Sequence, residues 1–150
     1  MVNLITHEML VLRARRWLKS RNYPVVLTEY ASWNFSEIPD AIGLNGKNSV
    51  VIECKASRSD FQGDKRKDHR SSKSAFGNYR YYLTPPNIVC PEDIPEGWGL
   101  LYVMDKKIVT AKKAQLHSDI EIKAKECILL YSLVRRVIGH GLMDKILESY

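Results

Sequence analysis

Residues 38–55 read IPDAIGLNGKNSVVIECK. Two apolar runs flank the pair Asn45-Gly46, and an Asn-Gly pair in that setting is the strongest short-range sign of a β-hairpin. Nearly every position of both runs is apolar, which predicts that both faces of the hairpin are covered by other parts of the chain. We therefore expect this hairpin to lie inside a sheet and to organise the rest of the fold.

Three charged residues interrupt the apolar hairpin: Asp40, Glu53 and Lys55. A short loop at Asn45 would put Asp40 opposite residues 51–53, while Glu53 and Lys55 point to the same face because side chains alternate along a strand. Two carboxylates that lie close together repel each other unless a cation lies between them or one of them is protonated. Oxygen ligands of this kind suit Mg²⁺. The alternative to a metal site is a purely structural role, in which Glu53 forms an ion pair with Lys55 and Asp40 lies near the turn.

The composition describes a basic protein of ordinary apolar content. The chain has 150 residues, a net charge of +6 and a sequence pI near 9.2. This length favours one domain, 1–150, with a real hydrophobic core. Basic residues gather in segments 8–21 and 58–80, on either side of the acidic hairpin. Such a charge balance fits a polyanionic partner such as nucleic acid.

The cysteines and the hydropathy pattern indicate a cytosolic protein. Cys54, Cys90 and Cys127 are widely spaced and show no zinc-ligand spacing. Cys54 and Cys127 lie in apolar segments and are expected to be small core residues in a reducing compartment. No signal peptide and no apolar run long enough to cross a membrane is found, so we expect no membrane partner.

Hydrophobic periodicity predicts a mixed α/β domain. Helical spacing favours a first helix at 6–21, capped by Thr6, and a polar helix after the serines that follow the hairpin. The charged segment 63–74 lacks apolar periodicity and is predicted to be an exposed loop. Strands are predicted at 25–28, 79–83, 99–104 and 108–110, the last two as a second hairpin. Helices covering a central mixed β-sheet account for this order.

A long C-terminal helix is predicted near residues 119–138, followed by a short terminal helix. Its apolar positions include Cys127, Leu130, Val134 and Ile138. The segment 119–150 either packs on the sheet or forms an interface, for example in a homodimer. The sequence leaves both alternatives open.

The hairpin motif resembles a known family. Pro39-Asp40, twelve intervening residues, and Glu53-Cys54-Lys55 resemble the signature of the PD-(D/E)XK nuclease superfamily. The strings at 52–61, 77–83 and 96–103 are similar to a compact group within it, which includes small phage nucleases and the MmcB-type DNA-repair family. The resemblance covers roughly residues 5–110. It implies a restriction-endonuclease-like fold.

The resemblance also implies a reaction, namely hydrolysis of DNA phosphodiester bonds with Mg²⁺ or Mn²⁺. Asp40 and Glu53 would hold the metal together with the main-chain carbonyl of Cys54. Lys55 would position the attacking water and offset charge on the phosphate. Glu8 would be a further acid near the metal, although an acid in the first turn of a helix also interacts favourably with the helix dipole.

The chemistry is consistent with these residue types. Phosphodiester hydrolysis needs a hydroxide at neutral pH and relief of the charge that grows on the phosphate, and a divalent metal supplies both. No small-molecule cofactor is expected. The basic residues downstream of the hairpin are predicted to contact the DNA backbone: Arg58, Lys65, Arg66, Lys67, Arg70, Lys73 and Arg80. Two alternatives remain: a DNA-binding module without turnover, and a structural partner in a phage or repair assembly.

Overall fold

A computed structural model describes residues 4–31, 35, 38–65 and 76–149. Within these residues the strands form one mixed sheet whose spatial order is the order of the chain. The pairs β1–β2, β2–β3 and β5–β6 are antiparallel, and β3–β4 and β4–β5 are parallel. The strands are β1 (Val25–Thr28), β2 (Ala41–Leu44), β3 (Ser49–Cys54), β4 (Tyr79–Thr84), β5 (Gly99–Val103) and β6 (Ile108–Lys112). The predicted α/β class with a central mixed sheet is confirmed, and the arrangement fits a restriction-endonuclease-like core.

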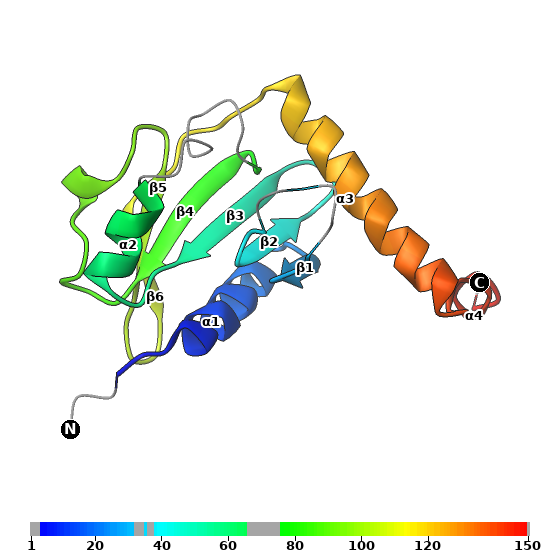
Figure 1. The fold of residues 1–150 in the computed structure, drawn as a ribbon, viewed down its shortest axis with the longest axis horizontal. Coiled ribbons are helices and arrows are strands. Elements are labelled where there is room, and N and C mark those ends of the chain that lie inside the picture. Colours follow the sequence, from blue (N-terminus) through cyan, green and yellow to red (C-terminus); the bar gives the residue numbers. More distant parts are fainter. Residues whose placement is uncertain (1–3, 32–34, 36–37, 66–75, 150) are drawn as a thin grey trace.

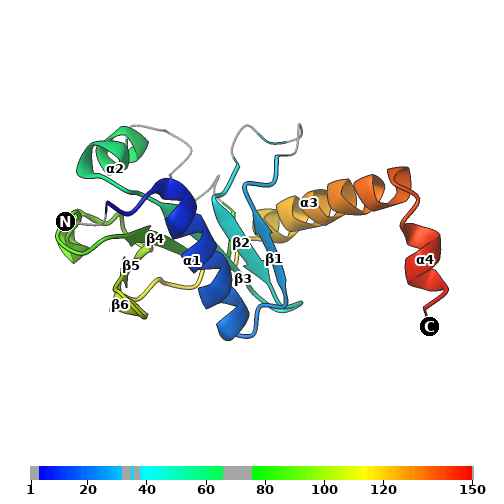
Figure 2. The ribbon, with the colours of Figure 1, turned by 90° about the horizontal axis from the view of Figure 1, so that it is seen from below.

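Helices cover both faces of this sheet (Figures 1 and 2). One face packs on α1, and the other packs on α2 near β4 and β5 and on α3 near β2 and β3. The remaining helix, α4, lies at the far end of α3, which extends beyond the sheet. The helical elements are α1 (His7–Ser20), α2 (Arg58–Lys65), the 3₁₀ turn η2 (Pro91–Asp93), α3 (Ile120–Gly139) and α4 (Met143–Leu147).

The first helix forms as its sequence predicts. The hydroxyl oxygen of Thr6 accepts a hydrogen bond from the Met9 N–H at 3.3 Å and so caps the helix. Leu10, Ala14 and Leu18 recur at helical spacing and are fully buried against the sheet. Helix α1 therefore fixes the position of its own N-terminal residues relative to the hairpin.

The central hairpin is the predicted one. All residues of β2 and β3 are buried, and Ala41 pairs with Ile52. In the connecting turn the Asn45 side chain accepts the backbone N–H of Asn48 at 2.8 Å, and Gly46 has a φ of 84°. Glycine adopts this left-handed conformation without strain. The turn fixes the strand register that positions the charged residues at the other end.

Two predictions about the fold are wrong in detail. Helix α2 continues to Lys65, so the predicted loop cannot begin at Gly63. Cys54 is buried as expected, but Cys127 is exposed. The reason is that α3 turns a different stripe towards the domain, consisting of Ile122, Glu126, Leu129 and Ser132.

Among the helices that the structure describes, none combines the length and the apolar character needed to cross a membrane.

Candidate metal centre

The backbone register of the hairpin brings Asp40 opposite Glu53. Asp40 immediately precedes β2, and the β2–β3 register places it opposite Glu53. The carboxylate of Asp40 accepts a hydrogen bond from the backbone N–H of Cys54 at 2.7 Å. Its side chain is 16% exposed. The site is therefore fixed by the strand pairing itself and by a bond from β3 to the Asp40 carboxylate.

Two further residues complete a cluster around Asp40. His7, at the start of α1, places Nε2 3.4 Å from Oδ1 of Asp40 and 3.2 Å from Oε1 of Glu29. Glu29 follows β1, and its backbone N–H donates to the Asp40 carbonyl at 3.0 Å. One ligand atom from each of the three side chains lies within 4.8 Å of the others. The start of helix α1, the end of β1 and the start of β2 thus each position one candidate metal ligand.

The donor set fits a divalent metal. Burial raises the pKa of the Asp40 carboxyl, while the Cys54 N–H, His7 and Lys55 act in the opposite direction. A desolvated carboxylate of this kind is stabilised in its charged form by a nearby cation. One imidazole nitrogen with two carboxylates widens the choice from Mg²⁺ towards Mn²⁺ and later first-row metals.

Glu53 and Lys55 lie at the same end of β3, and both are buried. Their charges converge with those of Asp40 and Glu29 around the Cys54 thiol. Burial makes the largest contribution to raising the pKa of this thiol. The charges of Asp40, Glu53 and Glu29 raise the pKa further, while Lys55 lowers it. The charges of Glu53 and Lys55 therefore both act on the Cys54 thiol, but the group of ligand atoms within 4.8 Å of one another, formed by His7, Glu29 and Asp40, does not include Glu53.

Lys55 has a partner that sequence reasoning missed. Its Nζ lies 3.2 Å from Oδ1 of Asp64, a buried residue of α2. The other Asp64 oxygen accepts the hydroxyl of Tyr82 at 2.9 Å. Asp64 lies in a stretch whose many basic residues suggested a loop. The ion pair of Lys55 is thus with Asp64, in place of the Glu53 partner considered from the sequence.

Arg80 is placed differently from its predicted role, whereas the role of Glu8 near a metal stays a prediction. Glu8 is exposed, and the backbone N–H groups and the Thr6 side chain at the helix start lower the pKa of its carboxyl. Arg80 is fully buried, and its Nε donates to the carbonyls of Phe76 and Gly77. The prediction that Arg80 contacts DNA is wrong for this structure, because its guanidinium holds the backbone before β4.

Among the other predicted DNA contacts, the structure describes the side chain of Arg58. Arg58 is half exposed and pairs with Asp93 at 3.2 Å, while also donating to the Ile88 carbonyl. Lys65 ends α2. Arg66, Lys67, Arg70 and Lys73 lie outside the described residues. Their predicted role in DNA contact stays a prediction.

His7 and Glu8 provide a matched test of which side chain serves the site. We expect His7→Ala to weaken Mn²⁺ binding about 10- to 100-fold, since it removes a nitrogen from the cluster around Asp40. Glu8→Gln should leave Mn²⁺ affinity within about twofold of the unmodified protein, because the Glu8 side chain points to solvent. Isothermal titration calorimetry measures both affinities. Equal losses for the two variants would contradict the assignment of His7.

The comparisons with known proteins bear on the fold alone. No protein-family model and no curated protein matches this sequence. Among solved structures, a protein of unknown function from Silicibacter pomeroyi is similar, with a TM-score of 0.67 and 20% sequence identity. The match covers 99% of this chain and 97% of that chain. The fold is therefore shared over nearly the whole of both chains.

Proposed function

We propose that this protein is a metal-dependent nuclease that hydrolyses DNA phosphodiester bonds in the cytosol, in phage DNA processing or DNA repair. The observation that carries the proposal is the placement of Asp40, His7 and Glu29 around one point, with Glu53 and Lys55 at the adjoining end of β3. The sequence resemblance to PD-(D/E)XK nucleases supports the same reading, since Asp40, Glu53 and Lys55 occupy its motif positions.

Each side chain has a distinct task in the proposed reaction. Asp40 and either Glu53 or the pair His7 and Glu29 would hold the divalent metal. When bound, the metal supplies a hydroxide near neutral pH and offsets charge on the phosphate. Lys55 places a positive charge beside the same carboxylates and would act on the scissile phosphate as a point charge.

Asp64 keeps the Lys55 ammonium in this position through the 3.2 Å ion pair. The hydrogen bond from Tyr82 orients the Asp64 carboxylate in turn. Because both residues are buried, Lys55 has little freedom to sample other rotamers. The ammonium is therefore preorganised beside the candidate metal centre.

A basic groove supports a polyanionic substrate. It lies between α1 and the β5–β6 turn and has a volume of about 450 Å³. The cations that line it include Arg16, Arg21, Lys106 and Lys107, against one acid, Asp105. Arg13 holds the turn in place by donating to three of its carbonyls. Side chains of this kind bind phosphates and release counterions from nucleic acid.

A second candidate function is DNA binding without cleavage. The buried pairing of Lys55 with Asp64 favours it, because an ammonium already neutralised by a carboxylate has less charge to offer a phosphate. In that case the basic groove would bind DNA, and the charged centre would serve stability only. The two functions differ in whether DNA is cut.

Incubation with DNA and metal distinguishes the two functions. Linear, nicked, branched and single-stranded DNA are each incubated with the purified protein in Mg²⁺ or Mn²⁺, with and without excess chelator. The nuclease proposal expects cleavage of at least one substrate, and its complete loss with chelator. Binding of DNA with no cleavage of any substrate would support the second function, and cleavage that survives the chelator would contradict the metal site.

The basic groove makes a separate prediction about salt. Replacing Lys106 and Lys107 by Gln should reduce the slope of log K against log salt by about 2 for DNA binding, since each phosphate contact accounts for about one unit. The same two changes at Lys113 and Lys145, which are exposed outside the groove, serve as a charge-matched control. Fluorescence anisotropy at several salt concentrations measures both slopes. Identical slopes for the two double variants would show that DNA does not enter the groove.

A further inference from the structure

Helix α3 has two apolar faces, and within the described part of the chain only one of them packs against the core. The inner face contributes Ile122 and Leu129 to the core, with Leu129 packed beside Ile42 and Val51. The outer face points the opposite way. Along α3 it is formed by Ile120, Ala124, Cys127, Tyr131, Val134 and Ile138, all exposed. We call these six residues the outer stripe.

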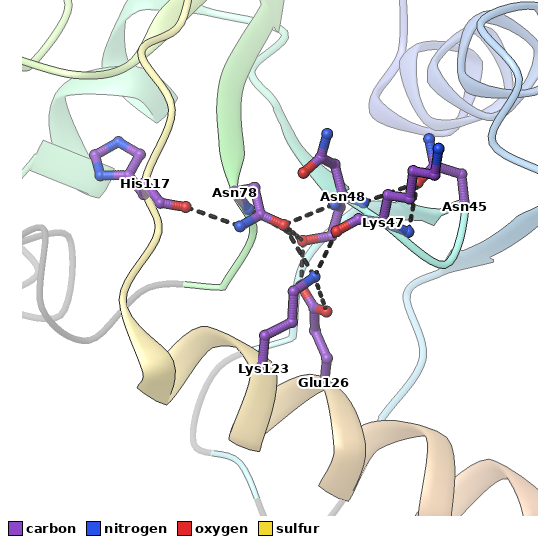
Figure 3. Close-up of polar contacts among 8 residues, drawn as sticks. Asn45, Lys47, Asn48, Asn78, His117, Lys123 and Glu126 are labelled. Carbon is purple, nitrogen blue, oxygen red and sulfur yellow. Dashed lines mark hydrogen bonds and ion pairs between the residues drawn. The ribbon is translucent and has the colours of Figure 1, made fainter.

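The base of α3 is held firmly, so the outer stripe has a defined direction. Figure 3 shows the polar contacts at this base. Glu126 is buried and accepts the hydroxyl of Ser49, and Lys123 Nζ lies 2.9 Å from the other Glu126 oxygen. Asn78 joins the same network through Lys123 and the Ser49 N–H. Further along, the Ser132 hydroxyl contacts that of Tyr30 at 3.2 Å. These contacts fix the rotation of the helix about its axis.

The outer stripe has the spacing of a coiled-coil seam. Its members follow one another at intervals of four, three, four, three and four residues, which is the a/d pattern of a heptad repeat. The inner-face residues Ile122, Glu126, Leu129 and Ser132 fall at the remaining positions of that heptad. Exposure reaches 60% at Tyr131 and 86% at Ile120. A seam that repeats along a whole helix and faces solvent is suited to a second helix.

We propose that the outer stripe pairs with the outer stripe of a second copy of this chain, with the two α3 helices antiparallel. The spacing of the stripe residues is symmetric about Leu129. An antiparallel pair centred there therefore places Cys127 opposite Tyr131 and Ala124 opposite Val134 of the other copy. Such a pairing is symmetric, as the commonest homodimers are. Helix α3 extends beyond the sheet, and its outer side faces away from it (Figures 1 and 2).

Charge complementarity favours this partner. Glu121 and Arg135 are both exposed and lie on the same side of the outer stripe, about four helical turns apart. In an antiparallel pair the same-side flanking positions of the two helices face each other. Glu121 of each copy then lies beside Arg135 of the other, which gives two reciprocal ion pairs. A second copy of the same chain therefore carries the complementary charges.

An apolar hollow beside the stripe adds to the surface. It has a volume of about 510 Å³ and lies between α3 and the β2–β3 turn. Its lining includes Leu44, Cys127, Leu130 and Val134. The proposed pair would cover this hollow as well as the stripe. The proposal does not rest on the nuclease function, since it uses none of the residues of the metal centre.

The mass of the full chain in solution tests the pairing. We expect sedimentation or light scattering at about 20 µM to give twice the 17.3 kDa chain mass. Val134→Glu places a charge within the seam and should weaken dimerisation at least about 30-fold. Leu12→Glu is the control, because Leu12 is 46% exposed on α1 and Val134 is 42% exposed on α3. A monomer at about 200 µM for the unmodified chain, or an undiminished dimer for Val134→Glu, would overturn the proposal.

A charge exchange tests the antiparallel orientation. Glu121→Arg and Arg135→Glu should each weaken the dimer, since each single change brings like charges together. The double variant should recover the affinity to within about threefold of the unmodified chain. A double variant weaker than both single variants would exclude the antiparallel pair.

The native Cys127 gives a readout that does not depend on stability. In the proposed pair the two Cys127 side chains lie about one helical turn apart near the centre of the seam. A short bifunctional maleimide should therefore cross-link the Cys90→Ser variant into a covalent dimer and leave the Cys127→Ser variant monomeric. Cross-linking through Cys90 alone would point to a different contact and contradict the proposal.

Discussion

Asp40→Asn should lower metal-dependent DNA cleavage at least about 100-fold. Asp40 is the residue shared by the hairpin pair with Glu53 and by the cluster with His7 and Glu29. In the proposed site, replacing its charged oxygen would remove a metal ligand, and a metal ion contributes several kcal/mol to stabilising the charge that develops in such a reaction. The amide oxygen of Asn can still accept the Cys54 N–H that Asp40 accepts at 2.7 Å, so the fold should be retained.

The matched control for this change is Asp60→Asn. Asp60 lies in the first turn of α2 and is exposed, so the same loss of charge occurs outside the metal centre. Cleavage rates with Mn²⁺ and Mn²⁺ affinity by calorimetry are measured for both variants. Unchanged cleavage by Asp40→Asn would show that the reaction uses another centre.

Asp64→Ala should lower the free energy of unfolding by about 3–5 kcal/mol. The change leaves the ammonium of Lys55 buried without its carboxylate and removes the acceptor of the Tyr82 hydroxyl. Breaking one side of a buried ion pair costs this much because the remaining charge is uncompensated. Urea denaturation followed by circular dichroism gives the free energy.

Two further variants test whether the loss of stability comes from leaving a buried charge without a partner. Arg58→Ala breaks the partly exposed pair with Asp93 at the same 3.2 Å distance, leaves the Cys90 N–H bonded to Asp93, and should cost at most about 1 kcal/mol. The double variant Lys55→Met with Asp64→Leu should be more stable than Asp64→Ala, because no charge is left unpaired. A loss below about 1 kcal/mol for Asp64→Ala would mean that Lys55 finds water or another partner.

The hairpin was predictable because its signal is local. Two apolar runs, an Asn-Gly turn and a period of two decide the register without knowledge of the rest of the chain, and the pairing of Asp40 with Glu53 follows. The same holds for α1, where capping by Thr6 and the spacing of the apolar residues agree. In these segments the hydrophobic pattern and the turn chemistry indicate the same structure.

The partners that sequence reasoning missed depend on how separate helices and strands pack against one another. Glu29 reaches Asp40 only because β1 pairs with β2, and a helix-start residue such as His7 is ordinarily exposed. Asp64 was hidden in a basic stretch, and its burial depends on how α2 packs against Tyr82. For α3 the sequence predicts the helix but not its buried face, since two stripes compete for one core and the polar contacts of Glu126 decide which one faces the sheet.

The sheet order has a consequence for how the protein forms during synthesis. Because each strand lies next to its predecessor in the chain, every newly made strand meets an edge that already exists. The charged end of β3 can be assembled as soon as α2 has emerged, since Lys55 and Asp64 are nine residues apart. Helix α3 arrives later and covers a hairpin that is already paired. Growth by addition at one edge keeps the search for partners short and limits the time for which unpaired strands are open to aggregation.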